Sequence, residues 1–246
     1  MPLQGIPGII GAGIRSAGVP GPSSITGLQV WLRADSYSLN DGDPISTDWT
    51  DLSGNSRAPS PINTPTFRTN QVNGKPVVEF TSASNEYFDS FNGWNPSGQT
   101  AGHGFIVIKV KNDPPAVDTA SGLWYFGSTA LDTHYPYTDS NIYDGFGSTT
   151  RQTVGDPTPS LATYRLYEVF SASNDWGALL DGASLFSTGT NTVGFNSAPR
   201  LGADNSPAVF INGFVAEFFL YNKKLSAGEQ STIYTYISNR YALSLP

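Results

Sequence analysis

The stretch Gly213-Phe-Val-Ala-Glu-Phe-Phe-Leu-Tyr221 decides the fold class, because it is the clearest strand in the sequence. Aromatic and aliphatic residues dominate it, and Glu217 is its one charged residue. The run Gly104-Phe-Ile-Val-Ile-Lys-Val110 is likewise apolar on both faces, which is typical of a central strand. We therefore expect a sheet, and we expect Glu217 to be a buried, hydrogen-bonded structural carboxylate within it.

Shorter strand-like runs lie outward from these two, each bounded by turn-forming residues. In residues 28–34, the apolar side chains of Leu28, Val30 and Leu32 alternate and share one face. Residues 176–182 end in an Asp-Gly pair, which predicts a hairpin turn. Further strands are predicted at residues 76–80, 123–126, 142–146 and 164–170.

One helix is predicted near the C-terminus. Ser226-Ala-Gly-Glu229 has the spacing of a capping box, in which each side chain bonds the backbone amide of the other residue. Ile233, Ile237 and Tyr241 then share one face, which should pack against the strands. Short strands with a single helix predict an all-β fold, a two-sheet antiparallel β-sandwich or jelly roll with one short C-terminal helix.

Composition limits the classes of protein to which these 246 residues can belong. Hydrophobic residues make up 38% and charged residues 13%, with 26 Gly and 18 Pro, so the chain has material for a core and for many turns. The net charge of −7 and the scattered 13 basic residues argue against nucleic-acid binding. The absence of Cys excludes disulfides and zinc-thiolate sites, and no apolar run is long enough to span a membrane.

Residues 1–24 differ in composition from residues 25–246, which we expect to form one domain. The first segment contains six Gly, four Pro and no aromatic residue; its collagen-like Gly spacing fails at Ile14, and its Pro residues argue against a secretion signal. One interpretation is a solvated terminus, and the other is an extended arm that docks on a partner. The docking residues would be Leu3, Ile6, Ile9, Ile10 and Ile14.

Motifs at the two ends of the body resemble a known family. The opening motif joins Leu28-Gln-Val-Trp-Leu-Arg-Ala-Asp-Ser36 to Trp49-Thr-Asp-Leu-Ser-Gly-Asn55, and Asn73-Gly-Lys-Pro-Val-Val-Glu-Phe80 follows. The closing motif is Ile211-Asn-Gly-Phe-Val-Ala-Glu-Phe-Phe-Leu-Tyr-Asn222 with the helix behind it. Together they resemble the laminin-G-like domains of the concanavalin A-like lectin/glucanase superfamily. The resemblance implies a jelly roll, but it implies little about function, because this superfamily includes lectins, hydrolases, lyases and virion proteins.

Catalytic patterns are missing from the sequence. The resemblance implies that hydrolases of this fold carry a pattern like Glu-x-Asp-x-x-Glu, and none of the five Glu residues begins one. No Gly-x-Ser-x-Gly motif occurs, and His103 lies in Ala-Gly-His-Gly, which we interpret as a turn. We therefore expect no enzymatic activity, and a polysaccharide hydrolase or lyase is the last of our hypotheses.

A loop rich in Tyr and Asp is the candidate glycan site. The run Asp132-Thr-His-Tyr-Pro-Tyr-Thr-Asp139 places two carboxylates, two Tyr rings and one imidazole within eight residues. Tyr offers an apolar face and Asp accepts hydrogen bonds from hydroxyl groups, which is the chemistry of sugar recognition, although an ordinary polar loop has the same composition. The candidates are Asp132, His134, Tyr135, Tyr137, Asp139 and the loop residue Trp94, which either stacks on a ligand or covers the core.

Calcium is the one metal that the sequence suggests. Asp41 and Asp43 lie in the densest acidic zone, and Ca²⁺ prefers carboxylate and carbonyl oxygens. The spacing of an EF-hand is absent, and the alternative is that these Asp residues form turns. The resemblance implies that laminin-G-like relatives often hold one calcium ion; no other cofactor is expected.

Two functional hypotheses from different classes remain open. The first is a non-enzymatic virion display protein, of the capsid-decoration or fibre type, whose arm binds a capsid or other virion protein while residues 25–246 face outward. A symmetric homo-oligomer such as a trimer would suit this role, and the exposed sandwich would contact host glycans. The alternative is a carbohydrate-binding module that acts alone, outside the cell or at a cell surface, with multivalency raising a weak affinity.

Overall fold

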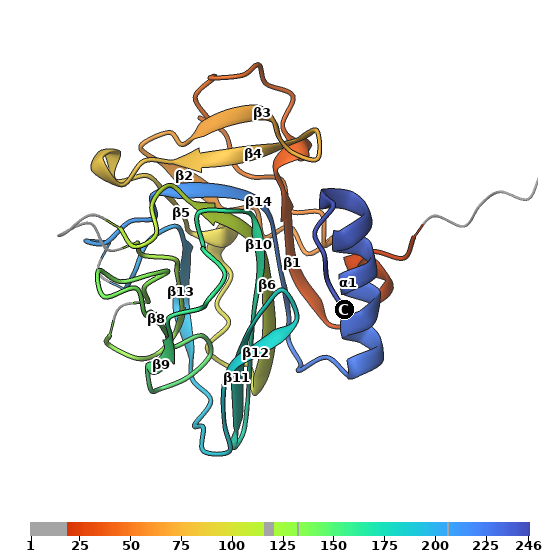
Figure 1. The fold of residues 1–246 in the computed structure, drawn as a ribbon, viewed down its shortest axis with the longest axis vertical. Coiled ribbons are helices and arrows are strands. Elements are labelled where there is room, and N and C mark those ends of the chain that lie inside the picture. Colours follow the sequence, from red (N-terminus) through yellow and green to blue (C-terminus); the bar gives the residue numbers. More distant parts are fainter. Residues whose placement is uncertain (1–18, 116–120, 132, 206) are drawn as a thin grey trace, which may run out of the picture.

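A computed structural model describes residues 19–115, 121–131, 133–205 and 207–246. These residues form fourteen β-strands and one α-helix, and every strand pair is antiparallel. The described part of the chain also contains four short 3₁₀ helices, at Pro22–Ser24, Ala34–Ser36, Ser82–Ser84 and Phe91–Gly93. The predicted all-β sandwich with one helix near the C-terminus is thereby confirmed (Figure 1).

The larger sheet is built around β14 (Gly213–Tyr221), the strand on which the sequence prediction rested. The first part of β14 pairs with β4 and the second part pairs with β1 (Leu28–Arg33), while β6 lies along its other side. The remaining order is β12 (Ala183–Thr188), β11 (Asp175–Leu180), β10 (Arg165–Ala172), β6 (Ala101–Val110), β14, β4 (Lys75–Phe80) and β3 (Thr66–Val72).

The second layer is made of shorter strands. Four of them pair in the order β2 (Ser60–Ile62), β5 (Tyr87–Asp89), β13 (Phe195–Leu201) and β7 (Trp124–Gly127), and β8 (Ile142–Asp144) forms a separate pair with β9 (Gln152–Gly155). The core lies between the layers, where the large fully buried side chains include Phe80, Phe126, Trp49, Trp124 and Trp176. The opening motif thus supplies Trp49 to the core.

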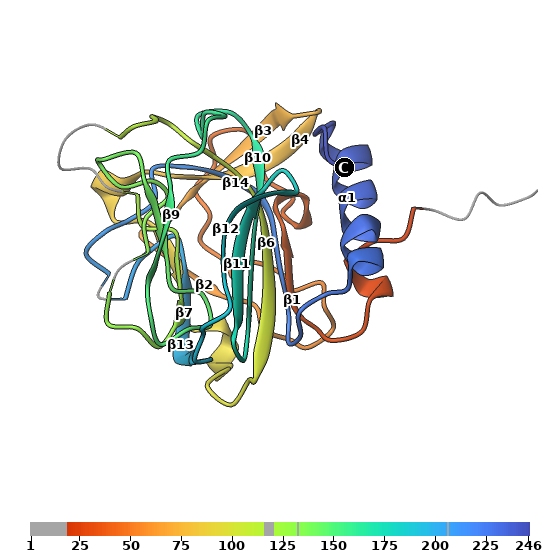
Figure 2. The same ribbon diagram turned by 60° about the horizontal axis from the view of Figure 1, so that its bottom comes forward.

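The helix α1 (Ala227–Tyr241) covers the outer face of the larger sheet (Figure 2). Its predicted capping box is present: the Ser226 side chain accepts from the Glu229 amide, and the Glu229 side chain accepts from the Ser226 amide. The helix buries Ile233, Ile237 and Tyr241 in a second apolar cluster, as expected. No helix in the described residues is long and apolar enough to cross a membrane.

Glu217 is buried beneath α1, which confirms the structural role expected for it. Its carboxylate accepts hydrogen bonds from Trp31 Nε1, from Tyr236 Oη at 2.9 Å and from Tyr241 Oη at 2.7 Å, and Arg240 Nε lies 3.5 Å away. Burial raises the pKa of Glu217, and these donors and the Arg240 charge oppose that shift. The carboxylate therefore links the helix to β1 and β14.

His103 does not lie in a turn, so that prediction is wrong. It is a fully buried residue of β6, where its Nδ1 accepts from the Leu225 amide at 3.1 Å. Its Nε2 lies 2.7 Å from Glu168 Oε1, close enough for an ion pair but not aligned as a hydrogen bond. The neighbouring glycines mark close packing instead of a turn: a Cβ at Gly102 would lie 2.5 Å from the ring of Phe195.

The polar residues of the opening motif close a loop next to β1. Asp51 accepts from the backbone amides of Trp31, Ser53 and Arg57, at 3.0, 2.9 and 2.8 Å. Asn55 donates from Nδ2 to the Leu28 and Gln29 carbonyls. The side-chain bonds of Asp51 and Asn55 are thus used in holding the loop, and these residues serve the fold.

Candidate functional site

The predicted Tyr- and Asp-rich loop folds back on β8. The backbones of His134 and Tyr143 exchange two hydrogen bonds, of 2.8 and 3.1 Å. A turn follows, in which the Tyr137 amide donates to the Asn141 carbonyl at 2.9 Å. The segment is therefore an extension of the second layer with its tip at residues 137–141, and its side chains have fixed neighbours.

Tyr137 presents an aromatic ring to solvent at this tip. Its side chain is 40% exposed, which makes it the most exposed aromatic residue in the described parts of the chain. The ring centroid lies 4.7 Å from that of His134 and 5.9 Å from that of Tyr143, which is nearly perpendicular to it. A ring held in this way has one part packed and one part free, as stacking on a sugar requires.

Asp139 supplies the acceptor that the sequence predicted beside this ring. Its Oδ2 accepts from Tyr143 Oη at 2.7 Å and its Oδ1 accepts from the Asn141 amide at 2.9 Å. Slight desolvation raises the pKa of Asp139, but these hydrogen bonds outweigh it and lower the pKa overall. The group is therefore a carboxylate at neutral pH, and its remaining lone pairs face solvent.

The imidazole of His134 stays neutral at this site. Burial, together with the nearby Arg151 charge, lowers the pKa of His134 to about 4. Arg151 itself lies with its guanidinium 4.8 Å from the centre of the Tyr143 ring. We call the group of His134, Tyr137, Asp139, Tyr143 and Arg151 the Tyr137 surface; it joins aromatic faces to one carboxylate and one guanidinium.

The other predicted members do not reach this surface. Tyr135 is fully buried, with its ring 4.9 Å from that of Tyr167, because it points into the core between the layers. Trp94 packs on Phe126 and lies beneath the guanidinium of Arg57 at 4.5 Å, so it covers the core as the alternative predicted. Asp132 lies outside the described residues, as do all the arm residues proposed for docking.

Two residues of the Tyr137 surface, Tyr143 and Arg151, were not predicted. Tyr143 was detectable from strand alternation, because Ile142 and Asp144 on either side of it are buried. Arg151 reaches the surface only because β9 pairs with β8, and no local pattern in the sequence indicates that pairing.

The candidate calcium ligands accept hydrogen bonds from backbone amides. Asp41 Oδ1 accepts from the Thr69 amide at 2.9 Å, and Asp43 Oδ2 accepts from the Asn40 amide at 2.8 Å. Within the described ranges, no three His, Asp or Glu side chains are grouped to hold a metal ion. Asp43 therefore fits the alternative role in a turn, whereas Asp41 joins its loop to β3.

Comparison with known proteins finds structures of similar fold but assigns no family. No protein-family model and no curated protein matches the sequence. Trypanosoma rangeli sialidase in complex with sialic acid is similar in structure, with a TM-score of 0.60 and 15% identity over 90% of this chain and 34% of that chain. The receptor-binding domain of botulinum neurotoxin mosaic serotype C/D is also similar, with a TM-score of 0.55 and 10% identity over 84% of this chain and 50% of that one.

A third similar structure is that of botulinum neurotoxin type C, whose cell entry depends on interaction with two ganglioside molecules. Its TM-score is 0.56, with 8% identity over 86% of this chain and 51% of the toxin chain. This chain therefore spans about a third of the sialidase chain and about half of each toxin chain. What these structures share with it is a two-sheet β-sandwich.

The sialidase likeness contradicts the expectation that this chain is not an enzyme. That expectation rested on the missing Glu-x-Asp-x-x-Glu pattern, and sialidases show that a sandwich like this one also occurs within enzymes. At 15% identity the likeness shows the fold, and it assigns no substrate and no catalytic residue to this chain. Glu168 and Glu217, the fully buried Glu residues of the described chain, lie beneath α1.

Proposed function

We propose that this protein binds carbohydrate through the Tyr137 surface. The observation that carries the proposal is the exposed Tyr137 ring, held by His134 and Tyr143 beside the Asp139 carboxylate. The ring can stack on the apolar face of a sugar while Asp139 accepts from its hydroxyl groups. Recognition by a rigid aromatic ring costs little conformational entropy, because the ring is already packed on one side.

The similar structures support this proposal through their ligands. The sialidase was solved in complex with sialic acid, and the type C neurotoxin depends on gangliosides for cell entry. A sandwich of this shape is thus found in chains that bind sugars. We extend the proposal to the family suggested by the end motifs, a concanavalin A-like jelly roll with a laminin-G-like arrangement.

The test is a glycan array probed with the full chain and with two variants of Tyr137. We expect Tyr137→Ala to weaken binding to the recognised glycan roughly tenfold, which corresponds to about 1.4 kcal/mol. Tyr137→Phe keeps the ring and serves as the matched control, so we expect it to bind nearly as well as the parent chain. Absence of binding by the parent chain across a broad array, or equal binding by Tyr137→Ala, would contradict the proposal.

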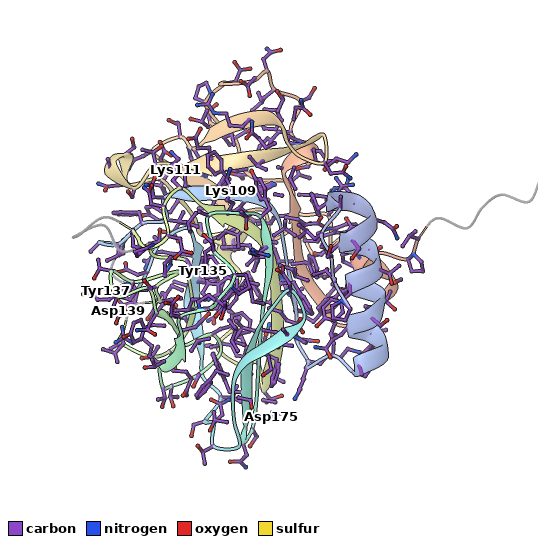
Figure 3. All side chains as sticks on the ribbon, in the orientation of Figure 1. Lys109, Lys111, Tyr135, Tyr137, Asp139 and Asp175 are labelled. Atoms are coloured by element: carbon purple, nitrogen blue, oxygen red, sulfur yellow. The ribbon has the colours of Figure 1, made fainter. Side chains whose placement is uncertain are left out.

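We also propose that residues 1–24 anchor the protein to a virion, with a capsid or other virion protein as partner. One observation supports this geometry: the described chain begins beside α1, where Tyr221 Oη donates to the Pro22 carbonyl, and Tyr137 lies on the opposite side of the sandwich (Figures 1 and 3). An anchor near α1 would leave the Tyr137 surface pointing away from the particle.

Deletion of residues 2–18 tests the anchor without removing the residues that pack against α1. We expect the shortened chain to keep its folded circular-dichroism spectrum and to lose co-migration with particles on a density gradient. Loading onto particles at the occupancy of the full chain would show that the arm is not the anchor.

A further inference from the structure

A second polar surface lies where β9 meets the turn between β10 and β11 and the loop after β12. There a groove of about 370 Å³ is lined by Thr150, Gln152, Asn174, Thr190, Asn191 and Thr192. All six side chains are uncharged, and each carries a hydroxyl or an amide. The volume falls at the lower end of the range of roughly 300–1,000 Å³ that is usual for small-molecule sites. We call it the amide groove.

The floor of the amide groove is rigid because Asn191 joins three chain segments. Its buried side chain accepts from Ser148 Oγ at 2.7 Å and donates to Ser171 Oγ at 3.0 Å and to the Ala172 carbonyl at 2.8 Å. Its backbone carbonyl accepts from the Asn174 amide at 3.0 Å. All these groups are satisfied within the chain, so they hold the groove in shape and leave ligand contacts to the rim.

The rim of the groove, unlike its floor, has side chains whose hydrogen-bonding groups are unsatisfied. The side chains of Gln152, Asn174 and Thr192 form no hydrogen bond with any described residue. Two amides and a hydroxyl therefore face the groove with several donors and acceptors free. Donors and acceptors of both kinds, without charge, match the hydroxyl groups of a sugar, each of which donates one hydrogen bond and accepts others.

We infer that the amide groove is a binding site for a neutral saccharide, an inference that rests on the proposed carbohydrate function and names its ligand class. No charged side chain lines the groove, and the net charge of −7 disfavours an anionic ligand. The groove is distinct from the Tyr137 surface. Tyr143 pairs with Thr153 and Asp144 pairs with Gln152, so Tyr143 and Gln152 lie on opposite faces of the β8–β9 hairpin.

The direct test follows the side-chain amide signals of Gln152 and Asn174 by NMR in the ¹⁵N-labelled full chain. The probes are lactose, maltotriose and cellotriose, with 3′-sialyllactose as the charged comparison. We expect at least one neutral probe to shift both amide signals, at lower concentration than sialyllactose does. If no neutral probe shifts them, or if sialyllactose shifts them at the lowest concentration, the inference is wrong.

Variants separate the groove from the Tyr137 surface. The double variant Gln152→Ala, Asn174→Gly removes both rim amides; Asn174 has φ of 57°, a conformation that Gly adopts without strain, so the turn should persist. Ser187→Ala, at an exposed hydroxyl of β12 outside the groove, is the matched control. We expect the double variant to lose about tenfold in affinity for the neutral probe and the control to lose none.

The two proposals fail in different ways. If Tyr137→Ala abolishes binding of the neutral probe and the double variant keeps it, the groove inference fails while the proposed function stands. If the amide shifts persist unchanged in Tyr137→Ala, the groove is confirmed and the Tyr137 surface is not the site for that sugar. If the parent chain binds no saccharide either on the array or by NMR, both proposals are wrong.

Discussion

The outer face of the larger sheet and the β8–β9 side of the second layer differ in whether their polar side chains have hydrogen-bond partners. Beneath α1, Glu217 accepts from three side chains, and Glu168 accepts from Gln230 and from Tyr234 Oη. On the other side, the side-chain amides of Gln152 and Asn174 form no hydrogen bond with any described residue. Polar groups whose hydrogen bonds are made within the chain hold elements together, whereas polar groups without such partners at a rigid surface are available to a ligand.

This contrast separates polar groups that stabilise the fold from polar groups that are accessible to a ligand. The carboxylates under α1 would be the first residues to suggest a catalytic pair, but each is enclosed and hydrogen-bonded by the helix. At the Tyr137 surface, by contrast, Tyr137 and Asp139 are exposed to solvent. Accessibility and unsatisfied hydrogen-bonding capacity are therefore our criteria for a candidate binding site, in preference to residue type.

The largest expected effect is at Glu217. Replacement of Glu217 by Ala leaves the Trp31, Tyr236 and Tyr241 donors unpaired in a buried place and removes the partner of Arg240. We expect the free energy of unfolding to fall by about 3–5 kcal/mol in urea titrations. Glu217→Gln should lose less, since its amide oxygen still accepts. A loss below about 1 kcal/mol for the Ala variant would show that the network does not hold α1.

Asp144 offers a second buried carboxylate, this time in the core of the second layer. It accepts from Trp124 Nε1, from the Phe146 amide and from Tyr167 Oη, yet burial still raises its pKa from 3.8 to about 6. Between these values the folded chain binds more protons than the unfolded chain, so this group's contribution to stability falls as the pH rises.

The stability contribution of Asp144 should therefore change by about 2–3 kcal/mol between pH 4 and pH 7, and Asp144→Asn should remove that change. The measurement is the free energy of unfolding of both chains across this range. The difference between variant and parent should move in favour of the variant as the pH rises. Parallel pH profiles would mean that Asp144 ionises as readily in the folded as in the unfolded state.

The cap of α1 gives a smaller effect. Ser226→Ala removes the acceptor for the Glu229 amide and should lower the unfolding free energy by about 1 kcal/mol. Ser231→Ala, at an exposed position inside the same helix, should change it little or raise it, because Ala is the better helix former. Equal effects of the two substitutions would show that the capping box contributes nothing to the stability of α1.

The smallest effect on stability is expected at the proposed binding site. Tyr137→Ala should leave the free energy of unfolding within about 0.5 kcal/mol of the parent value, since much of the ring is exposed. The same variant is expected to lose sugar binding, so stability and binding should separate. A loss of about 2 kcal/mol or more would make Tyr137 a structural residue of the loop.

Strong local patterns were predicted correctly, and close tertiary packing was not. The apolar run of β14, the Asp181-Gly182 turn and the capping box at Ser226 each depend on neighbours in sequence, and all three are present. The short strands β2, β5 and β13 escaped prediction because each is partly polar and pairs over long sequence separations. His103 was misplaced because its flanking glycines serve packing.

The sequence by itself determined the class of fold, the place of the helix and the residue types of the loop that we propose as a sugar-binding site. Periodicity and capping are local, so they can be recognised without knowing what lies across the sheet. Only the tertiary structure decided that Tyr135 faces the core, that Arg151 joins Tyr143, and that Asn191 shapes a groove rimmed by free amides. These outcomes depend on strand pairing between distant segments, because pairing sets which side chains become neighbours and which face solvent.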